Sequence, residues 1–180
     1  MIITDTRVIK RTTAGLERVV PYIIHQGGTS SGKTYGNNYA IISHLLYYKK
    51  DEKLTVSIVA ITFPHLRKGA MRDFINILEK CNLTDKIKHN KSEHTFTFPS
   101  GSIVEFFSVD SYEKALGLRR DILFINECNS IPYDVFFQLS IRTSKTIILD
   151  YNPTSKFWFQ KTLLPSLKSH EYIYTRTTYR

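Results

Sequence analysis

The sequence predicts an α/β fold, in which a mostly parallel central sheet forms the middle layer of an α/β/α sandwich and carries an inserted β-hairpin. Three observations support this prediction. Short apolar runs alternate with amphipathic segments, as they do where strands and helices follow one another. A glycine- and serine-rich loop directly follows the first apolar run. One later segment alternates apolar and polar residues, turns at Pro99-Ser100-Gly101 and alternates again, which is typical of a hairpin.

The expected elements follow these patterns along the chain. Strands are expected where β-branched and apolar residues run together, and helices where apolar residues recur every three or four positions. The expected strands cover residues 22–25, 55–62, 122–126, 146–150 and 172–175, and the hairpin covers residues 94–108. The expected helices cover residues 33–48, 66–80, 132–141 and 157–164. Right-handed crossovers between parallel strands then place helices on both faces of the sheet.

Composition predicts one soluble, intracellular domain over residues 1–180. The chain is 42% hydrophobic, which suffices for a sizeable core, and no apolar run approaches the roughly 20 residues that span a bilayer. Residues 1–10 lack the apolar segment and cleavage site of a secretion signal. Cys81 and Cys128 lie far apart without metal-binding spacing, so we expect two reduced thiols.

Basic residues outnumber acidic ones, and the formal net charge is +9. Such a surplus favours a polyanionic partner such as nucleic acid. The basic residues are scattered along the chain rather than gathered on one segment. Charge therefore leaves a nucleic-acid surface and an ordinary solvated basic surface equally open.

The strongest motif is a phosphate-binding loop that matches G-x-x-x-x-G-K-[ST] and lies between an expected strand and an expected helix. Gly27 and Gly32 are expected to adopt backbone angles that other residues resist, so that successive N–H groups form an anion-binding nest at the start of the helix. Lys33 is expected to reach the β- and γ-phosphates of ATP, and the Thr34 hydroxyl to coordinate Mg²⁺. The expected nucleotide-binding residues of the loop are Gly27, Gly28, Thr29, Ser30, Ser31, Gly32, Lys33 and Thr34.

Two further apolar strands end in polar residues. Glu127 follows the strand at 122–126, and we interpret it as the catalytic base that polarises the attacking water. Asn126 stands where the common pattern has Asp, and is expected to hold Mg²⁺ through a water without contributing charge. Asp150 and Asn152 follow the other strand and are candidate γ-phosphate sensors, because ligands lie at the carboxyl ends of parallel strands. An ordinary Asn-Pro turn is the alternative interpretation of that segment.

A glutamate directly at a strand end indicates the ATPase branch of P-loop NTPases, which includes RecA-like motors. The segment Asn90-Lys91-Ser92-Glu93 superficially matches the guanine-reading motif of GTPases, but it has Glu in place of Asp and precedes the acidic strand. We therefore expect ATP rather than GTP.

Taken in order, these motifs resemble the ATPase domain of the large terminase subunit of tailed phages. The phosphate loop is followed by Leu66-Arg67-Lys68 at a helix start, by the hairpin, by the segment 114–118 ahead of Glu127, and by the Asp-Tyr-Asn-Pro segment at 150–153. The resemblance implies that the domain powers translocation of double-stranded DNA into a preformed capsid, in the host cytoplasm. It also implies a homo-oligomeric ring, with the portal and the small terminase subunit as partners and no membrane. Residues 150–152 correspond to the family's coupling motif.

Three departures from the family's pattern concern charge. Thr29 and Leu116 stand where many members have arginine, and Asn126 replaces an aspartate. Because an arginine stabilises the transition state in P-loop enzymes, Arg119 or Arg120 is a candidate for that role, in cis or from a neighbouring subunit. A solvated basic pair is the alternative.

Several alternatives stay open. The chain is expected to lack the family's C-terminal nuclease domain, because the acids after Asp150 form no cluster. A helicase-like or RecA-like ATPase would prefer single-stranded nucleic acid. Asn126 and the absent loop arginine favour a nucleotide-binding module that does not hydrolyse. A small-molecule kinase is disfavoured because no arginine-rich lid is evident.

Overall fold

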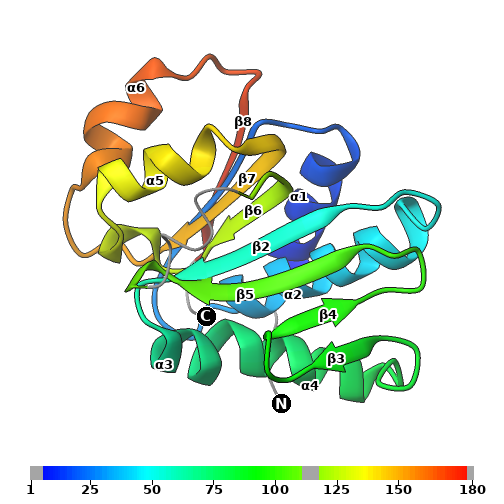
Figure 1. Cartoon of the computed structure of the whole chain (residues 1–180). Helices are drawn as coiled ribbons and strands as arrows, with labels where there is room; N and C mark the ends of the chain where they lie inside the picture. Colours follow the sequence, from blue (N-terminus) through cyan, green and yellow to red (C-terminus); the bar gives the residue numbers. More distant parts are fainter. Residues whose placement is uncertain (1–5, 111–117, 178–180) are drawn as a thin grey trace.

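The computed structural model describes residues 6–110 and 118–177, and the expected α/β fold is confirmed (Figure 1). Within these residues, one sheet has the strand order β3-β4-β5-β2-β6-β7-β1-β8. Its strands are β1 Tyr22–Gly27, β2 Thr55–Ala60, β3 Lys88–Asn90, β4 Thr95–Thr97, β5 Ile103–Ser108, β6 Arg120–Ile125, β7 Thr143–Tyr151 and β8 Tyr172–Thr177. The helices are α1 Thr6–Glu17, α2 Lys33–Ser43, α3 Phe63–Leu66, α4 Arg72–Lys80, α5 Tyr133–Ser140 and α6 Leu164–Ser166.

The sheet combines a parallel body with an antiparallel margin. Strands β5, β2, β6, β7, β1 and β8 pair in parallel, whereas β3 and β4 pair antiparallel and join the sheet through β5. The expected hairpin is confirmed as β4 and β5. Since parallel strands end at the same edge, the segments that follow β1, β6 and β7 come together there.

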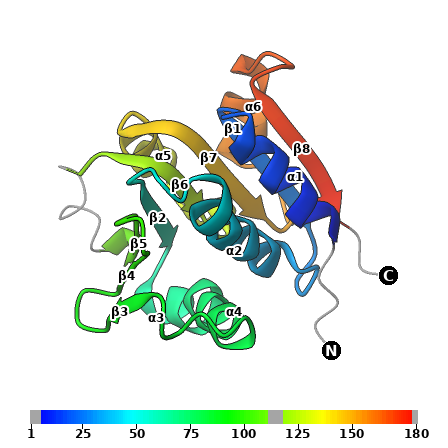
Figure 2. The same cartoon turned by 90° about the vertical axis from the view of Figure 1, so that its right-hand side faces the viewer.

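Helices cover both faces of the sheet, as Figure 2 shows with α1, α2 and α4 on one side and α5 and α6 on the other. Alternate residues of each strand point to opposite faces, so Ile23 belongs to the core cluster that includes residues of α2 and α4, while its neighbour Ile24 belongs to the cluster that includes residues of α5. Both residues are fully buried. A strand buried on two faces must be apolar throughout, which explains the continuous apolar runs in the sequence.

Two elements were not expected from the sequence. Helix α1 precedes β1 and lies against α2, and only part of its buried face is apolar because Thr12 and Gly15 belong to it. Gly15 lies so close to Ile23 that a methyl group in its place would approach Ile23 Cδ1 to 2.5 Å. Strand β3 has no buried residue and thus no apolar alternation to reveal it.

Several of the described helices continue into or adjoin a wider, π-helical turn. Helix α2 continues into His44–Tyr48, α3 is joined to α4 by Arg67–Met71, and α6 follows Phe159–Leu163. The helix after β2 therefore starts at Phe63 rather than at residue 66. Thr62 caps it, since its hydroxyl accepts a hydrogen bond from His65 N at 3.4 Å.

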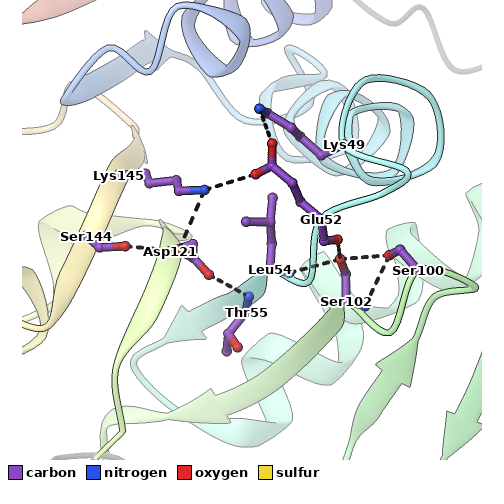
Figure 3. Close-up of polar contacts among 9 residues, drawn as sticks. All are labelled: Lys49, Glu52, Leu54, Thr55, Ser100, Ser102, Asp121, Ser144 and Lys145. Atoms are coloured by element: carbon purple, nitrogen blue, oxygen red, sulfur yellow. Dashed lines mark hydrogen bonds and ion pairs between the residues drawn. The ribbon is translucent and has the colours of Figure 1, made fainter.

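A polar cluster closes the edge of the sheet at which β2, β6 and β7 begin (Figure 3). The Asp121 carboxylate of β6 accepts hydrogen bonds from Thr55 N at 2.9 Å and from Ser144 Oγ at 3.0 Å. Glu52 pairs with Lys49 at 2.6 Å and with Lys145 at 3.3 Å. These contacts satisfy strand ends at the edge opposite the phosphate loop, so the two edges of the sheet serve different purposes.

The imidazole of His44 predicts a pH-dependent stability. His44 is 3% exposed, and burial, assisted by the nearby charge of Lys49, lowers its pKa from 6.5 to about 4. The unfolded chain therefore binds a proton that the folded chain rejects, and stability is lost as the pH falls from about 6.5 towards about 4. We expect His44 to account for a loss of about 2 kcal/mol, after allowance for solvent screening.

Urea denaturation at pH 7 and pH 5 measures this loss. The His44→Gln variant should show a flatter dependence on pH than the parent, because its amide does not titrate. If the free energy of unfolding falls by the same amount between pH 7 and pH 5 in both proteins, the assignment to His44 is contradicted.

Candidate nucleotide-binding and hydrolysis site

The phosphate loop joins β1 directly to α2, as its sequence predicts. Gly32 occupies the position before the first residue of α2 and has φ 77°, which confirms the expected left-handed backbone there. Ser30 also has a positive φ of 64°. The loop thus turns sharply, so that the N-terminus of α2 points to the space above the carboxyl ends of the strands.

Gly27 is required for a different reason from the one the motif suggests. Its backbone angle is not left-handed, so the expectation of a special backbone angle is wrong for this glycine. A Cβ atom at this position would lie 1.8 Å from Thr177 Oγ1 and 2.7 Å from the Thr177 carbonyl oxygen. The loop and the end of β8 therefore approach so closely that only glycine fits.

The ammonium group of Lys33 lies inside the loop. It donates hydrogen bonds to the carbonyl oxygens of Gly27 at 2.7 Å and Gly28 at 2.9 Å, and contacts Ser31 Oγ and Asn152 Oδ1 at 3.1 Å each. Lys33 is 7% exposed, and this burial lowers its pKa, while the nearby carboxylates of Asp150 and Glu127 oppose the change. The charge is thus held over the sheet edge and close to two acids.

Asp150 is the centre of the polar contacts below the loop. Its carboxylate is 1% exposed and accepts hydrogen bonds from Glu127 N at 2.7 Å, Asn126 Nδ2 at 3.0 Å and Thr34 Oγ1 at 3.1 Å. Burial raises the pKa of Asp150, and the backbone hydrogen bond from Glu127 and the charge of Lys33 counteract it. The start of α2 and the turn after β6 are therefore joined to the end of β7 through one carboxylate.

Strand order explains this convergence. Strand β7 lies between β1 and β6, with Asp150 beside His25 of β1 and Leu149 beside Ile125 of β6. Asn152, just beyond β7, contacts Thr29 of the loop through its amide nitrogen at 3.5 Å as well as Lys33 through its oxygen. The sequence predicts that these strand ends meet, and the structure brings them together.

Glu127 adopts a left-handed conformation, with φ 55° and ψ 53°, immediately after β6. Such a conformation is uncommon for a residue other than glycine and is found at functional sites. Its side chain is 38% exposed, and its Oε2 atom lies 3.2 Å from His65 Nε2 on α3. His65 was not anticipated, because only the three-dimensional adjacency of β2 and β6 brings the segment after β2 to Glu127.

The two arginines proposed to stabilise charge lie elsewhere. Arg119 and Arg120 lie where β6 begins, at the edge of the sheet opposite Glu127. Arg120 is 2% exposed and donates hydrogen bonds to Ser57 Oγ at 2.8 Å and to the Leu139 carbonyl oxygen at 3.3 Å. The assignment of Arg120 is therefore corrected to a structural one, because strand alternation buries it. Arg119 is exposed, and Leu116 lies outside the described residues.

Thr177 is a further residue of the site that the motifs do not reveal. Its hydroxyl contacts Ser31 Oγ at 3.0 Å and the Gln26 carbonyl oxygen at 3.2 Å. The Gln26 side chain, in turn, accepts a hydrogen bond from Tyr151 Oη at 3.0 Å. Side chains of β7 and β8 thus support the phosphate loop from below.

Within residues 6–110 and 118–177, no three His, Cys, Asp or Glu side chains gather as a metal site. No helix in the same ranges is long and apolar enough to cross a membrane. Cys81 and Cys128 are both free, and burial raises the pKa of Cys128 well above its usual value. Burial therefore disfavours the Cys128 thiolate, which is the nucleophilic form of the thiol.

The fold and this arrangement define a P-loop NTPase domain. The family model for the phage terminase large subunit matches residues 20–180, and the chain belongs to this family. A comparison with curated proteins finds no match.

Solved structures of large terminases share the fold. The large terminase of a thermophilic bacteriophage has a TM-score of 0.77 and 16% identity, over 96% of this chain and 45% of that one. The same protein in complex with ATP-gamma-S has a TM-score of 0.71 and 17% identity, over 96% and 44%. The ATPase domain of the Thermus phage P74-26 large terminase has a TM-score of 0.63 and 12% identity, over 98% and 86%. The chain thus spans less than half of a whole large terminase and most of the isolated ATPase domain.

The close approach of the loop and β8 can be tested with two neighbouring glycines. Gly27→Ala should destabilise the protein by at least about 2 kcal/mol, because the new methyl group collides with the hydroxyl and the backbone carbonyl oxygen of Thr177. Gly28→Ala is the matched control, since a Cβ there meets nothing within 4 Å. Chemical denaturation measures both, and equal stabilities would show that β8 can move away freely.

Proposed function

We propose that this chain is an ATP-binding and ATP-hydrolysing motor domain that powers the packaging of double-stranded viral DNA into a procapsid. The observation that carries the proposal is the meeting of a lysine, a threonine and two acids, Lys33, Thr34, Glu127 and Asp150, at one edge of the sheet. Membership of the terminase family supplies the DNA-packaging context.

Nucleotide binding uses the loop and the start of α2. The N–H groups of the loop and the positive end of α2 attract the phosphates of ATP. Lys33 exchanges the carbonyl oxygens of Gly27 and Gly28 for phosphate oxygens, which bring the negative charge that those carbonyls lack. The large terminase of the thermophilic bacteriophage has been solved with ADP and with ATP-gamma-S, which supports nucleotide binding by this fold.

The residues below the loop fit a magnesium ion. Mg²⁺ prefers oxygen ligands, and the Thr34 hydroxyl lies 3.1 Å from a buried carboxylate oxygen of Asp150. When bound with the nucleotide, Mg²⁺ neutralises charge on the β- and γ-phosphates. Thr34 would coordinate the ion directly, and the side chains of Asn126 and Asp150 both contact its hydroxyl, at 3.0 Å and 3.1 Å.

Hydrolysis depends on Glu127. Its carboxylate accepts a proton from the attacking water while the water oxygen bonds to the γ-phosphorus and ADP leaves with the former bridging oxygen. Its backbone N–H is held by Asp150, which keeps the left-handed turn in place. Asn152 bridges Lys33 and the loop, so it is positioned to respond to the γ-phosphate.

A charge-stabilising arginine comes from another subunit in this proposal. Lys33 lies inside the loop, and Arg120 is held at the opposite edge of the sheet. Arg119 is exposed and is free to reach a neighbouring subunit across an interface. A homo-oligomeric ring on the portal would supply such an interface. We expect no nuclease activity from this chain.

A nucleotide-binding module without turnover is the second candidate, and Asn126 favours it. This amide replaces the carboxylate that commonly ends the strand, so hydrolysis would fail if metal binding required charge at position 126. A helicase-like ATPase differs in its preference for single-stranded nucleic acid.

ATP hydrolysis over a range of protein concentrations, with and without double-stranded DNA, distinguishes these functions. Lys33→Ala and Glu127→Gln should each lower turnover at least about 100-fold, the first through weaker binding and the second with nucleotide affinity retained. The specific rate should rise with protein concentration as subunits assemble.

The outcome against the motor assignment is equally clear. If nucleotide binds through Lys33 but turnover never exceeds that of Glu127→Gln, the isolated chain is a binding module. If single-stranded DNA stimulates turnover and double-stranded DNA does not, the helicase-like assignment replaces it.

A further inference from the structure

Of the two strand ends below the phosphate loop, β6 is followed by an amide and β7 ends in a carboxylate, which is the reverse of what the common pattern predicts. The amide, Asn126, follows β6, where the common pattern has a carboxylate that orients the metal. The carboxylate, Asp150, lies at the end of β7, one strand closer to the loop. Both side chains contact the Thr34 hydroxyl, Asn126 at 3.0 Å and Asp150 at 3.1 Å. Either position is therefore close enough to act on a metal bound by Thr34.

The orientation of Asn126 decides between the two positions. Its nitrogen donates to both oxygens of Asp150, at 3.0 Å and 3.2 Å, and to Thr34 Oγ1. Its oxygen points away, towards the backbone of Gly69, where a Cβ atom would lie 3.7 Å from it. Asn126 consequently turns its N–H groups towards the space beside Thr34. A metal ion needs an oxygen ligand there, and its water ligands need hydrogen-bond acceptors, so these N–H groups serve neither.

The hydrogen-bond partners of Asp150 are donors without charge. They are a hydroxyl, an amide and a backbone N–H, all of them neutral. Within the described residues, no lysine or arginine forms an ion pair with it, and the nearby Lys33 ammonium donates instead to the loop and Asn152. A buried carboxylate with neutral partners is costly, and a divalent cation would offset that cost.

We infer that Asp150 is the carboxylate that orients Mg²⁺ beside Thr34. It takes the role that the common pattern gives to a carboxylate at position 126, so that β7 rather than β6 supplies the negative charge. This inference rests on the proposed nucleotide-binding function and assigns its metal-orienting residue. Asn126 then acts as a positioning residue, which holds both oxygens of Asp150 through its nitrogen. The absence of charge at position 126 no longer implies a weak metal site.

The test measures how strongly Mg²⁺ tightens binding of a fluorescent ADP analogue, and records the electron paramagnetic resonance spectrum of Mn²⁺ bound with ADP. The variants are Asp150→Asn and the double exchange Asn126→Asp with Asp150→Asn. Compared with its own affinity in the absence of metal, Asp150→Asn should lose at least about 10-fold of the Mg²⁺-dependent gain in affinity, and it should lose the bound Mn²⁺ signal. The double exchange should regain both.

Asp150→Asn that folds and keeps the full Mg²⁺-dependent gain would overturn the inference while leaving nucleotide binding intact. If that variant does not fold, the double exchange decides, since it restores one carboxylate and one amide: a folded double variant without metal dependence also overturns the inference. Failure of the parent protein to bind the analogue under any condition would instead refute the proposed function.

Discussion

Burial of a carboxylate is the constraint on which the site depends. Asp150 sits almost without solvent at the end of β7, so its charge must be satisfied by neighbouring donors or the fold loses stability. The donors come from the loop-proximal helix α2 and from the turn after β6, through Thr34, Asn126 and the backbone of Glu127. The hydrogen bonds of this one side chain thereby hold the end of β7, the start of α2 and the turn after β6 together. The left-handed turn at Glu127 is retained because its N–H has this acceptor.

The order of the strands makes this arrangement possible. With β7 between β1 and β6, a residue at its end reaches both neighbours, whereas residues after β1 and β6 are separated by a full strand width. The opposite edge of the sheet is closed by ordinary capping contacts, among them those of Asp121 with Thr55 and Ser144. One edge of the sheet is thus closed by contacts that satisfy the strand ends, while the loops at the other edge carry the residues of the site.

Much of the fold follows from local patterns, and the omissions have physical causes. The apolar runs identify the buried strands, because both faces of the sheet are covered by helices. Helix α1 is not evident because its buried face includes Thr12 and Gly15, and β3 is not evident because none of its residues is fully buried. At the site, the motif predicts the positions of Lys33, Thr34 and Glu127, but not His65 or Thr177. His65 lies on α3 and Thr177 at the end of β8, and both reach the site only through the fold. Arg120 looked like a surface cation because its burial depends on strand alternation and on the acceptor at Ser57.

The contact between Gly27 and Thr177 has a mechanical consequence. Strand β8 lies at the margin of the described sheet and pairs there with β1, in parallel, through six residue pairs from Tyr22 with Tyr172 to Gly27 with Thr177. Tension along β8 loads all of these pairs at once in shear, rather than peeling them apart one by one. Thr177 also forms hydrogen bonds with Ser31 and with the Gln26 carbonyl oxygen. A force on this end of β8 is therefore transmitted directly to the phosphate loop. Strand β8 therefore couples the two: a displacement of the strand changes the conformation of the phosphate loop, and a change in the loop displaces the strand.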